Sequence, residues 1–188
     1  LSRTLVHSSL LQRMRCRGME VSPSRVEAAR VWAREKMQTA TEAIRSTTAI
    51  SRFEIARGPF NPASSDHVRH LVCGILGFDG GKASRKTGKA SVNKDWLEQN
   101  VSRHPIFTHL LELRRAAKYE GNYLKNIVKN THGGRVRPRW QIGGAVTWRL
   151  SCSEPNLQNL PPGIMRSCIV APEGKVLVEN DYSQIELR

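Results

Sequence analysis

The sequence predicts an α+β protein that is mainly helical over its first two thirds and built from short strands afterwards. Apolar residues recur at helical spacing from the N-terminus to about residue 130. At His132-Gly133-Gly134 this pattern ends, and short extended pieces separated by Gly-Gly and Pro-Pro pairs follow. We therefore expect a lead-in of helix and extended chain over 1–22, a helical domain over 23–130, and the first strands of a sheet over 131–188.

The lead-in and the first long helix have clear boundary signals. A helical pattern of apolar residues opens the chain, and Gly18 offers its C-terminal stop. A short extended piece follows at 19–21. Ser22-Pro23 combines an N-cap with proline at the first helical position, which predicts that a long helix begins there. Its apolar face continues to about residue 50 and comprises Val26, Ala29, Ala33, Met37, Ala40 and Ile44.

Beyond this helix the pattern is interrupted several times. After Gly58-Pro59, Ser64 or Ser65 caps a helix that runs to about Leu76. Residues 80–91 are Gly, Lys, Arg, Ser and Thr with almost no apolar side chain, so we expect a flexible loop. Two more helices are predicted at 93–101 and 105–128, and the extended pieces after them are 135–140, 145–150, 167–171 and 176–179.

The last residues place one carboxylate between a strand and a helix. Residues 176–178 (Val-Leu-Val) predict a short, mostly buried strand. Ser183 and Glu186 have the spacing of a capping box, in which the serine caps a new helix and the glutamate reaches back. Asp181 lies between these elements, where a carboxylate suits Mg²⁺, an ion that takes only one or two protein carboxylates. In the alternative interpretation, Asp181 is an ordinary turn residue and Glu186 only a cap.

Composition favours a polyanionic partner. The 188 residues include 30 Lys and Arg against 16 Asp and Glu, a net charge of +14, and nucleic acid is the first candidate. An acidic membrane surface is the competing partner, but no apolar run approaches the length of a membrane span. The cysteines form no CxxC pair and the histidines no HExxH, so we expect reduced thiols in an intracellular protein. Both ends of the sequence look cut, so we expect a piece of a longer protein.

Four stretches carry a resemblance to one family. The octet DYSQIELR at 181–188 resembles the first palm carboxylate motif of family A DNA polymerases, the DNA polymerase I group. The segment RLSCSEPNLQNLP at 149–161 is similar to that family's arginine-led, PNLQN-containing segment. Residues 60–64 (FNPAS) resemble its Phe-Asn-x-x-Ser segment in the thumb, and 111–123 resemble its Arg-x-x-x-Lys helix at the base of the thumb. The resemblance implies a helical thumb over 23–130 and the first part of an antiparallel palm over 131–188. It places the lead-in at the junction of the two and leaves the fingers and the rest of the palm outside this chain.

The resemblance also implies the function and the site. A template-directed DNA polymerase transfers a deoxynucleotide from a dNTP to the 3′-hydroxyl of a primer with two Mg²⁺ ions. The implied metal ligands are Asp181, which is also catalytic, and the backbone carbonyl of Tyr182, with a second carboxylate outside this chain. Glu186, the second catalytic residue, lies beneath the sugar of the incoming nucleotide and excludes a 2′-hydroxyl, with Ser183 and Gln184 beside it. The implied contacts with primer–template DNA are Arg149, Asn156, Gln158, Asn159, Arg114, Lys118, Asn61 and Ser64, and the residues 80–91 add Lys82, Arg85, Lys86 and Lys89.

Two alternatives to this function stay open. Trp148 stands where the family usually has glycine before the arginine, so an indole could displace the strand or narrow the DNA channel. A non-catalytic duplex-binding remnant is one alternative, and one half of a split polymerase, completed by a separate chain, is the other. In every case we expect this chain alone to be inactive, inside the cytoplasm or nucleoid of a bacterial or phage-like system, with an organelle not excluded and no membrane partner.

Overall fold

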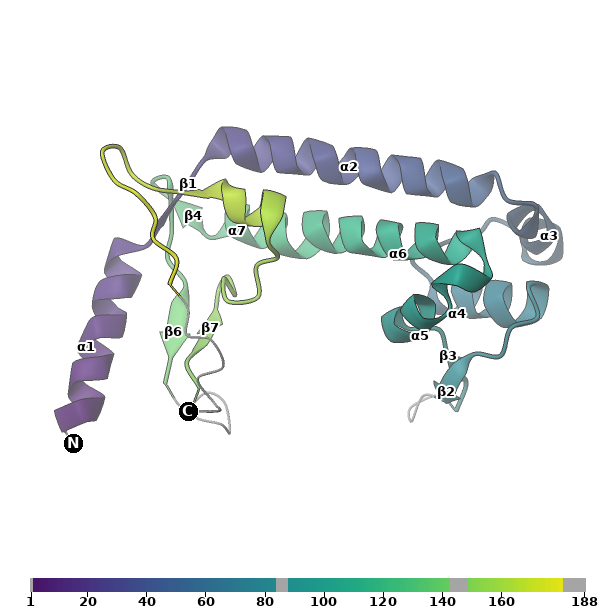
Figure 1. Cartoon of the computed structure of the whole chain (residues 1–188), viewed down its shortest axis with the longest axis horizontal. Helices are drawn as coiled ribbons and strands as arrows, with labels where there is room; N and C mark the ends of the chain where they lie inside the picture. Colours follow the sequence, from purple (N-terminus) through teal and green to yellow (C-terminus); the bar gives the residue numbers. More distant parts are fainter. Residues whose placement is uncertain (1, 84–87, 143–148, 181–188) are drawn as a thin grey trace. The chain divides into compact units, whose positions relative to one another are not determined.

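A computed structural model describes residues 2–83, 88–142 and 149–180, and it has the α+β architecture that the sequence predicts (Figure 1). The chain divides into two compact units. We call residues 31–120 the helical unit, and residues 1–30 with 121–188 the sheet unit. Within the described ranges no helix is both long enough and apolar enough to cross a membrane.

The helical unit is built from consecutive helices and one strand pair. Its elements are most of α2 (Pro23–Arg45), α3 (Thr48–Arg57), α4 (Ser65–Arg69), the π-helical η1 (His70–Ile75), β2 (Gly81–Ala83), β3 (Ala90–Ser91), α5 (Lys94–Gln99), the 3₁₀ turn η2 (Val101–Arg103), α6 (Pro105–Lys118) and the start of the π-helical η3 (Tyr119–Leu124). The predicted helices at 65–76, 93–101 and 105–128 are thereby confirmed to within a few residues.

The predicted helix from 23 to about 50 is wrong at its end, because α2 stops at Arg45 and α3 begins at Thr48. The Ser46 hydroxyl donates to the Ala43 carbonyl at 2.9 Å, and the Thr47 hydroxyl donates to the Ile44 carbonyl. Such local side-chain bonds compete with the helical hydrogen bonds of the backbone. Thr47 adopts an extended backbone and becomes the N-cap position of α3. The side-chain bonds of Ser46 and Thr47 therefore accompany the end of α2, although the apolar pattern of the sequence continues to about residue 50.

Aromatic rings from separate helices form the core of the helical unit. Phe53 and Phe107 are fully buried. Phe53 meets the Phe60 ring edge-on at 5.1 Å between centroids, and Phe107 meets Trp96 in the same way at 5.3 Å. Each such pair adds about 0.5–1.5 kcal/mol beyond its area burial. The aliphatic residues packed in the same core are Ala40, Ile44, Ala49, Ile50, Val68, Leu71, Val72, Val92, Leu97, Ile106, Leu110 and Leu113.

Within the stretch 80–91, where the sequence predicts a flexible loop, the described residues Gly81–Ala83 and Ala90–Ser91 form a strand pair. β2 and β3 pair antiparallel, with Gly81 opposite Ser91 and Ala83 opposite Ala90. A Cβ at Gly80 would lie 2.6 Å from the Ala90 Cβ, and one at Gly81 would lie 3.0 Å from the Ser91 carbonyl oxygen. The glycines thus permit the close approach of the two strands, and the absence of apolar residues was misleading. Arg85 and Lys86 lie outside the described residues.

The sheet unit joins both ends of the described chain. It holds α1 (Ser2–Arg17), β1 (Met19–Val21), α7 (Lys125–Lys129), β4 (Thr131–His132), β5 (Arg135–Val136), β6 (Arg139–Gln141), β7 (Ser151–Ser153), the 3₁₀ helix η4 (Gly163–Cys168) and β8 (Ile169–Val170). Four strands form an antiparallel sheet in the order β4-β5-β1-β8, and β6 and β7 form a separate antiparallel pair. The predicted pieces at 135–140 and 167–171 contain strands. The piece at 145–150 lies largely outside the described residues, and β7 begins just after it.

β1 is an inner strand of the four-stranded sheet. Glu20 lies opposite Arg135 on one side and opposite Val170 on the other. Arg135 donates from Nη1 to the Glu20 carboxylate at 3.2 Å and from Nε to the Arg17 carbonyl at 2.7 Å. This arginine therefore binds both β1 and the C-terminal end of α1, where a cation is favoured by the helix dipole.

The predicted strand over Val176–Val178 is wrong. This segment has no strand pairing, and its Val176, Leu177 and Val178 residues are 81%, 58% and 84% exposed. A short run of apolar residues forms a buried strand only if another strand satisfies its backbone N–H and C=O groups. None of the strands in the described part of the chain pairs with this segment.

The turn between α1 and β1 depends on Gly18, which gives the first prediction. Gly18 has φ +61°, and a Cβ there would lie 2.6 Å from the Val136 carbonyl oxygen. Gly133 has φ +58°, and a Cβ added to it would meet nothing within 4 Å. Gly133→Ala should therefore cost only the left-handed backbone penalty, about 1–2 kcal/mol. Gly18→Ala should lower the free energy of unfolding by clearly more, measured by urea denaturation of both variants. Equal losses would show that the β5 backbone does not constrain this turn.

Candidate nucleic-acid interface

Several predicted site residues lie outside the described part of the chain. They are Asp181, Tyr182, Ser183, Gln184, Glu186, Arg85, Lys86 and the unusual Trp148. The predicted capping box at Ser183 and Glu186 therefore stays a prediction.

The described residues contain no metal-binding cluster of their own. Among residues 2–83, 88–142 and 149–180 no group of three or more His, Cys, Asp or Glu side chains could hold a metal ion. Glu179, the described carboxylate nearest in sequence to Asp181, is paired with Arg166 at 2.8 Å. The predicted Mg²⁺ ligands, the Asp181 carboxylate and the Tyr182 carbonyl, lie outside the described residues and stay a prediction.

The loop before α4 holds Asn61 and Ser64 in a fixed arrangement. Ser64 Oγ accepts from the His67 N–H at 3.3 Å, so the predicted cap is confirmed at Ser64. Asn61 Oδ1 accepts from the Ala63 N–H at 2.9 Å, while the Asn61 N–H donates to His67 Nδ1 at 3.1 Å. His67 itself packs against the buried Phe53 ring, 5.2 Å between centroids. Both predicted DNA-binding residues are therefore held by the hydrophobic core through His67.

Three basic side chains surround the Asp66 carboxylate. Arg57 Nη1 lies 3.3 Å from Oδ2, Lys89 Nζ lies 4.0 Å from Oδ1, and Arg69 Nη2 pairs with Oδ1. We call Asp66, Arg57, Arg69 and Lys89 the Asp66 cluster. The hydrogen bond from Arg69 and then its charge hold the pKa of Asp66 below its usual value, and the charges of Lys89 and Arg57 act in the same direction. Asp66 is therefore an anion at neutral pH.

The Asp66 cluster brings together residues that the sequence left apart. Lys89, a predicted DNA contact beside β3, is joined through Asp66 to the helix that Ser64 caps. Sequence analysis missed Arg57, Arg69 and Asp66. The i,i+3 spacing of Asp66 and Arg69 on a predicted helix was a usable signal. The contact of Arg57 with Asp66 depends on the path of the chain between α3 and α4 and has no such signal.

Arg114 has a structural contact in addition to its predicted role. This α6 residue is half-buried, and its Nη1 donates to the Val92 carbonyl oxygen at 3.1 Å. Burial lowers the pKa of Arg114, but an arginine stays protonated in proteins at physiological pH. Because Val92 directly follows β3, Arg114 fixes the base of the strand pair to α6. Lys118 and Lys82 lie exposed at the end of α6 and in β2.

The sheet unit carries the other four predicted DNA contacts near β7. Arg149, Asn156, Gln158 and Asn159 are all exposed. Gln158 Nε2 donates to the Leu150 carbonyl at 3.0 Å, and Asn156 Oδ1 accepts from the Asn159 N–H at 3.3 Å. These bonds fold the PNLQN segment back onto the chain beside Arg149. They leave the second amide hydrogen of Gln158 and the side chain of Asn159 on the surface.

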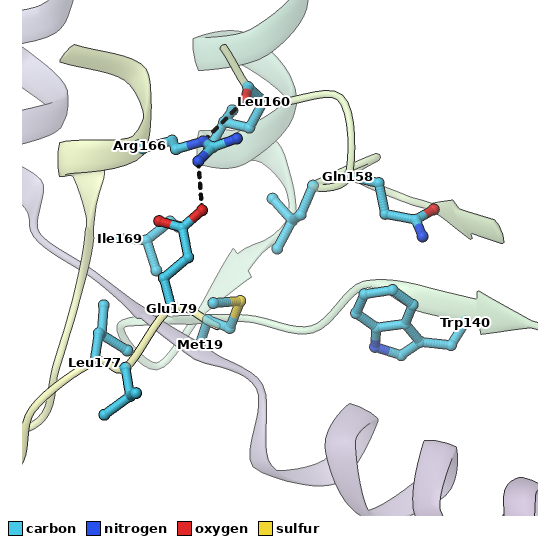
Figure 2. A pocket seen from close by; sticks show the side chains of 10 residues that line it. Met19, Trp140, Gln158, Leu160, Arg166, Ile169, Leu177 and Glu179 are labelled. Carbon is cyan, nitrogen blue, oxygen red and sulfur yellow. Dashed lines mark hydrogen bonds and ion pairs between the residues drawn. The ribbon is translucent and has the colours of Figure 1, made fainter. Parts of the chain in front are cut away.

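A pocket of about 530 Å³ adjoins this segment (Figure 2). Gln158 and Trp140 lie on one side of it, and Leu177 and Glu179 on the other. Arg166 donates to the Leu160 carbonyl at 3.4 Å and to the Glu179 carboxylate at 2.8 Å, so it connects η4 with the C-terminal segment. Most of the remaining wall is apolar, and the exposed Leu177 and Val178 are part of it.

Arg114 supplies the second prediction. Arg114→Met keeps the aliphatic stem but leaves the Val92 carbonyl without its donor, so it should lower the free energy of unfolding by about 1 kcal/mol. Arg115→Met, on the exposed side of the same helix, should change it little. Thermal or urea unfolding of both variants measures the difference. If the two variants have the same stability, the Arg114–Val92 bond contributes nothing measurable.

Comparison with known proteins places the chain in a family. The family model of DNA polymerase family A matches residues 30–188. The thermostable DNA polymerase I of Thermus thermophilus is 32% identical over 96% of this chain and 22% of the relative. The enzyme of the same name from Thermus aquaticus is 36% identical over 72% of this chain and 17% of the relative. The DNA polymerase I of Chloroflexus aurantiacus is 34% identical over 72% of this chain and 16% of the relative.

A solved structure shows the same fold. The POL domain of Pol1 from M. smegmatis, in complex with DNA primer-template and dNTP, superposes with a TM-score of 0.75 at 24% identity, over 87% of this chain and 28% of that chain. The chain spans about a fifth of the length of the curated relatives that it matches over most of its residues. The family model extends from residue 30, within α2, to the last residue. It includes both the PNLQN segment and the octet at 181–188. This chain therefore belongs to DNA polymerase family A.

Proposed function

We propose that this chain is the thumb and the first part of the palm of a template-directed DNA polymerase. The observation that carries the proposal is the family match over residues 30–188. The relatives are DNA polymerases I, and the similar solved structure is described as a complex with DNA primer-template and dNTP. The net charge of +14 supports a polyanionic partner. In this proposal the helical unit belongs to the thumb and most of the sheet unit to the palm.

The proposed thumb holds the duplex by its backbone. Asn61 and Ser64 lie on a loop fixed by His67, Lys82 lies in β2, and Lys89 directly precedes β3. With Arg85, Lys86, Arg114 and Lys118 they supply the phosphate contacts. Contacts to phosphates position a duplex without identifying its sequence, which is what a polymerase needs when it copies any template.

The proposed palm segments contact the primer end and the incoming nucleotide. Arg149 reaches the minor groove, which presents acceptors at every base pair and so tests shape more than sequence. Asn156, Gln158 and Asn159 add contacts to primer and template. Glu186, beside Ser183 and Gln184, lies under the sugar of the nucleotide and excludes a 2′-hydroxyl by its bulk. These residues bind and orient; attack by the primer 3′-hydroxyl on the α-phosphate releases pyrophosphate.

The proposed ligands for Mg²⁺ are the Asp181 carboxylate and the Tyr182 carbonyl. When bound, the ions stabilise the negative charge that develops on the attacking and leaving oxygens. A second carboxylate must come from outside this chain, since a lone aspartate does not hold two ions. The 188-residue chain should consequently bind duplex but not extend a primer by itself, and labelled dNTP incorporation by the purified chain would contradict this.

Duplex binding gives the third prediction. Primer–template DNA should bind to this chain with little dependence on its sequence, measured by fluorescence anisotropy with several unrelated duplexes. Because each neutralised phosphate releases counterions, affinity should fall steeply between low and moderate salt, with a slope of roughly −0.9 per phosphate contact on a log–log plot. A flat salt dependence, or a strong preference for one sequence, would contradict a backbone-binding thumb.

Glu186 gives the fourth prediction, for the enzyme that contains this chain together with its remaining parts. Glu186→Ala removes bulk, so use of ribonucleotides should rise relative to deoxynucleotides, measured as the ratio of kcat/KM values in single-nucleotide incorporation. Glu186→Gln keeps most of the bulk and a capping side chain, and it is the matched control. If Glu186 only caps a helix, the alanine variant should lose about 1 kcal/mol of stability or less and leave the ratio unchanged.

A further inference from the structure

We propose that Arg57, Arg69 and Lys89 form a binding site for backbone phosphates of duplex DNA, and that Asp66 is the positioning residue of this site. The inference rests on the proposed function and adds to it two arginines that the sequence did not single out. It also implies that Asp66, although negatively charged, strengthens the binding of a polyanion.

The geometry of the Asp66 cluster is the first argument. Its basic residues come from three different places: the last turn of α3, the end of α4, and the residue before β3. One carboxylate contacts all three, with Arg57 at 3.3 Å and Lys89 at 4.0 Å on its different oxygens. No element of regular structure would otherwise hold these three side chains together. Asp66 is therefore the feature that makes them converge.

The charge balance is the second argument. Three cations around one carboxylate leave a local surplus of two positive charges, so the cluster still attracts phosphate. Arg57 is 48%, Lys89 60% and Asp66 47% exposed, while Arg69 is partly covered and 24% exposed. Surface ion pairs of this kind contribute little to folding stability. A contribution to binding therefore explains the convergence better than a contribution to the fold.

The location is the third argument. Asp66 lies two residues after Ser64, and the loop of Asn61 and Ser64 is the proposed phosphate contact of the thumb. Long basic side chains lose conformational freedom when they bind a phosphate, and this loss costs about 0.5–1.5 kcal/mol for each immobilised side chain. Cations already held by Asp66 lose less on binding. Asp66 thus weakens the Coulombic attraction of the cluster for phosphate, but it lowers the entropic cost of binding because the basic side chains are already positioned.

The experiment compares two substitutions that change the net charge identically. Asp66→Asn and Asp79→Asn each raise it from +14 to +15, because one of the 16 acidic residues is lost. Asp79 is an exposed residue of the same unit outside the cluster. Anisotropy of a labelled primer–template duplex gives Kd for the 188-residue chain and both variants across a salt series. If charge alone matters, both variants bind DNA more tightly than the wild-type chain.

With Asp66 as a positioning residue, Asp79→Asn binds at least as tightly as the wild-type chain, while Asp66→Asn binds more weakly by up to about tenfold. Its salt slope should also become shallower, since fewer phosphates are neutralised at once. Equal tightening in the two variants overturns the inference and leaves the proposed function intact. A wild-type chain that does not bind duplex at all overturns both.

Arg57 provides a second variant in case Asp66→Asn fails to fold, which circular dichroism would reveal. Arg57→Gln should reduce the salt slope by about one phosphate contact, whereas Arg52→Gln, an exposed arginine on the same helix, should reduce affinity less. Equal effects of Arg57→Gln and Arg52→Gln would overturn the site. The effects of Asp66→Asn and Arg57→Gln should be less than additive in the double variant, because both act on one site.

Inorganic phosphate at constant ionic strength distinguishes a duplex site from a site for free phosphate. The duplex should stay bound, because it contacts several basic groups jointly. Displacement of the duplex from the wild-type chain by inorganic phosphate, absent in Arg57→Gln, would assign the cluster to a free phosphate and overturn its assignment to DNA.

Discussion

Backbone pairing of the three-residue strand β1 holds the sheet unit together. It joins Glu20 to Arg135, 115 residues away, and Val21 to Ile169 on the other side. A strand this short is not stable alone, so its pairing depends on both neighbours and on the contacts at its ends. Arg135 and Gly18 supply those contacts, since one binds the carbonyls at the end of α1 and the other permits the sharp turn. If β1 were displaced, α1, the β4–β5 hairpin and β8 would lose their common element.

The net charge of +14 overstates how much positive charge is available to a polyanionic partner. Several arginines donate to backbone carbonyls instead: Arg25 to Ser167, Arg135 to Arg17, Arg137 to Cys16, and Arg166 to Leu160. The planar guanidinium group suits this use, because it offers five donors in a fixed geometry. Only the individual contacts distinguish the cations that stabilise the fold from the cations that remain available at the surface. The Asp66 cluster shows that a third class exists, in which cations are paired yet accessible.

The apolar segment at 176–178 lies beside the pocket, and the two share one feature. Both lie in the sheet unit, next to Gln158 and Arg166, and both present apolar surface that a folded domain normally covers. The relatives are about five times longer than the part that this chain matches.

The sequence by itself determined the α+β class, the helix limits set by Gly18, Pro23 and Ser64, and the family, because these depend on local backbone preferences and on short motifs. It also identified the candidate residues at 149–161 and 181–188, because their order along the chain carries the resemblance. Only the tertiary structure decided that residues 19–21 form an inner strand, that Gly81–Ala83 pairs with Ala90–Ser91, and that Val176–Val178 stays unpaired. It alone brought Arg57, Arg69 and Lys89 to Asp66. Each of these outcomes depends on which distant backbone or charge a segment meets, and periodicity in one segment contains no information about its partner.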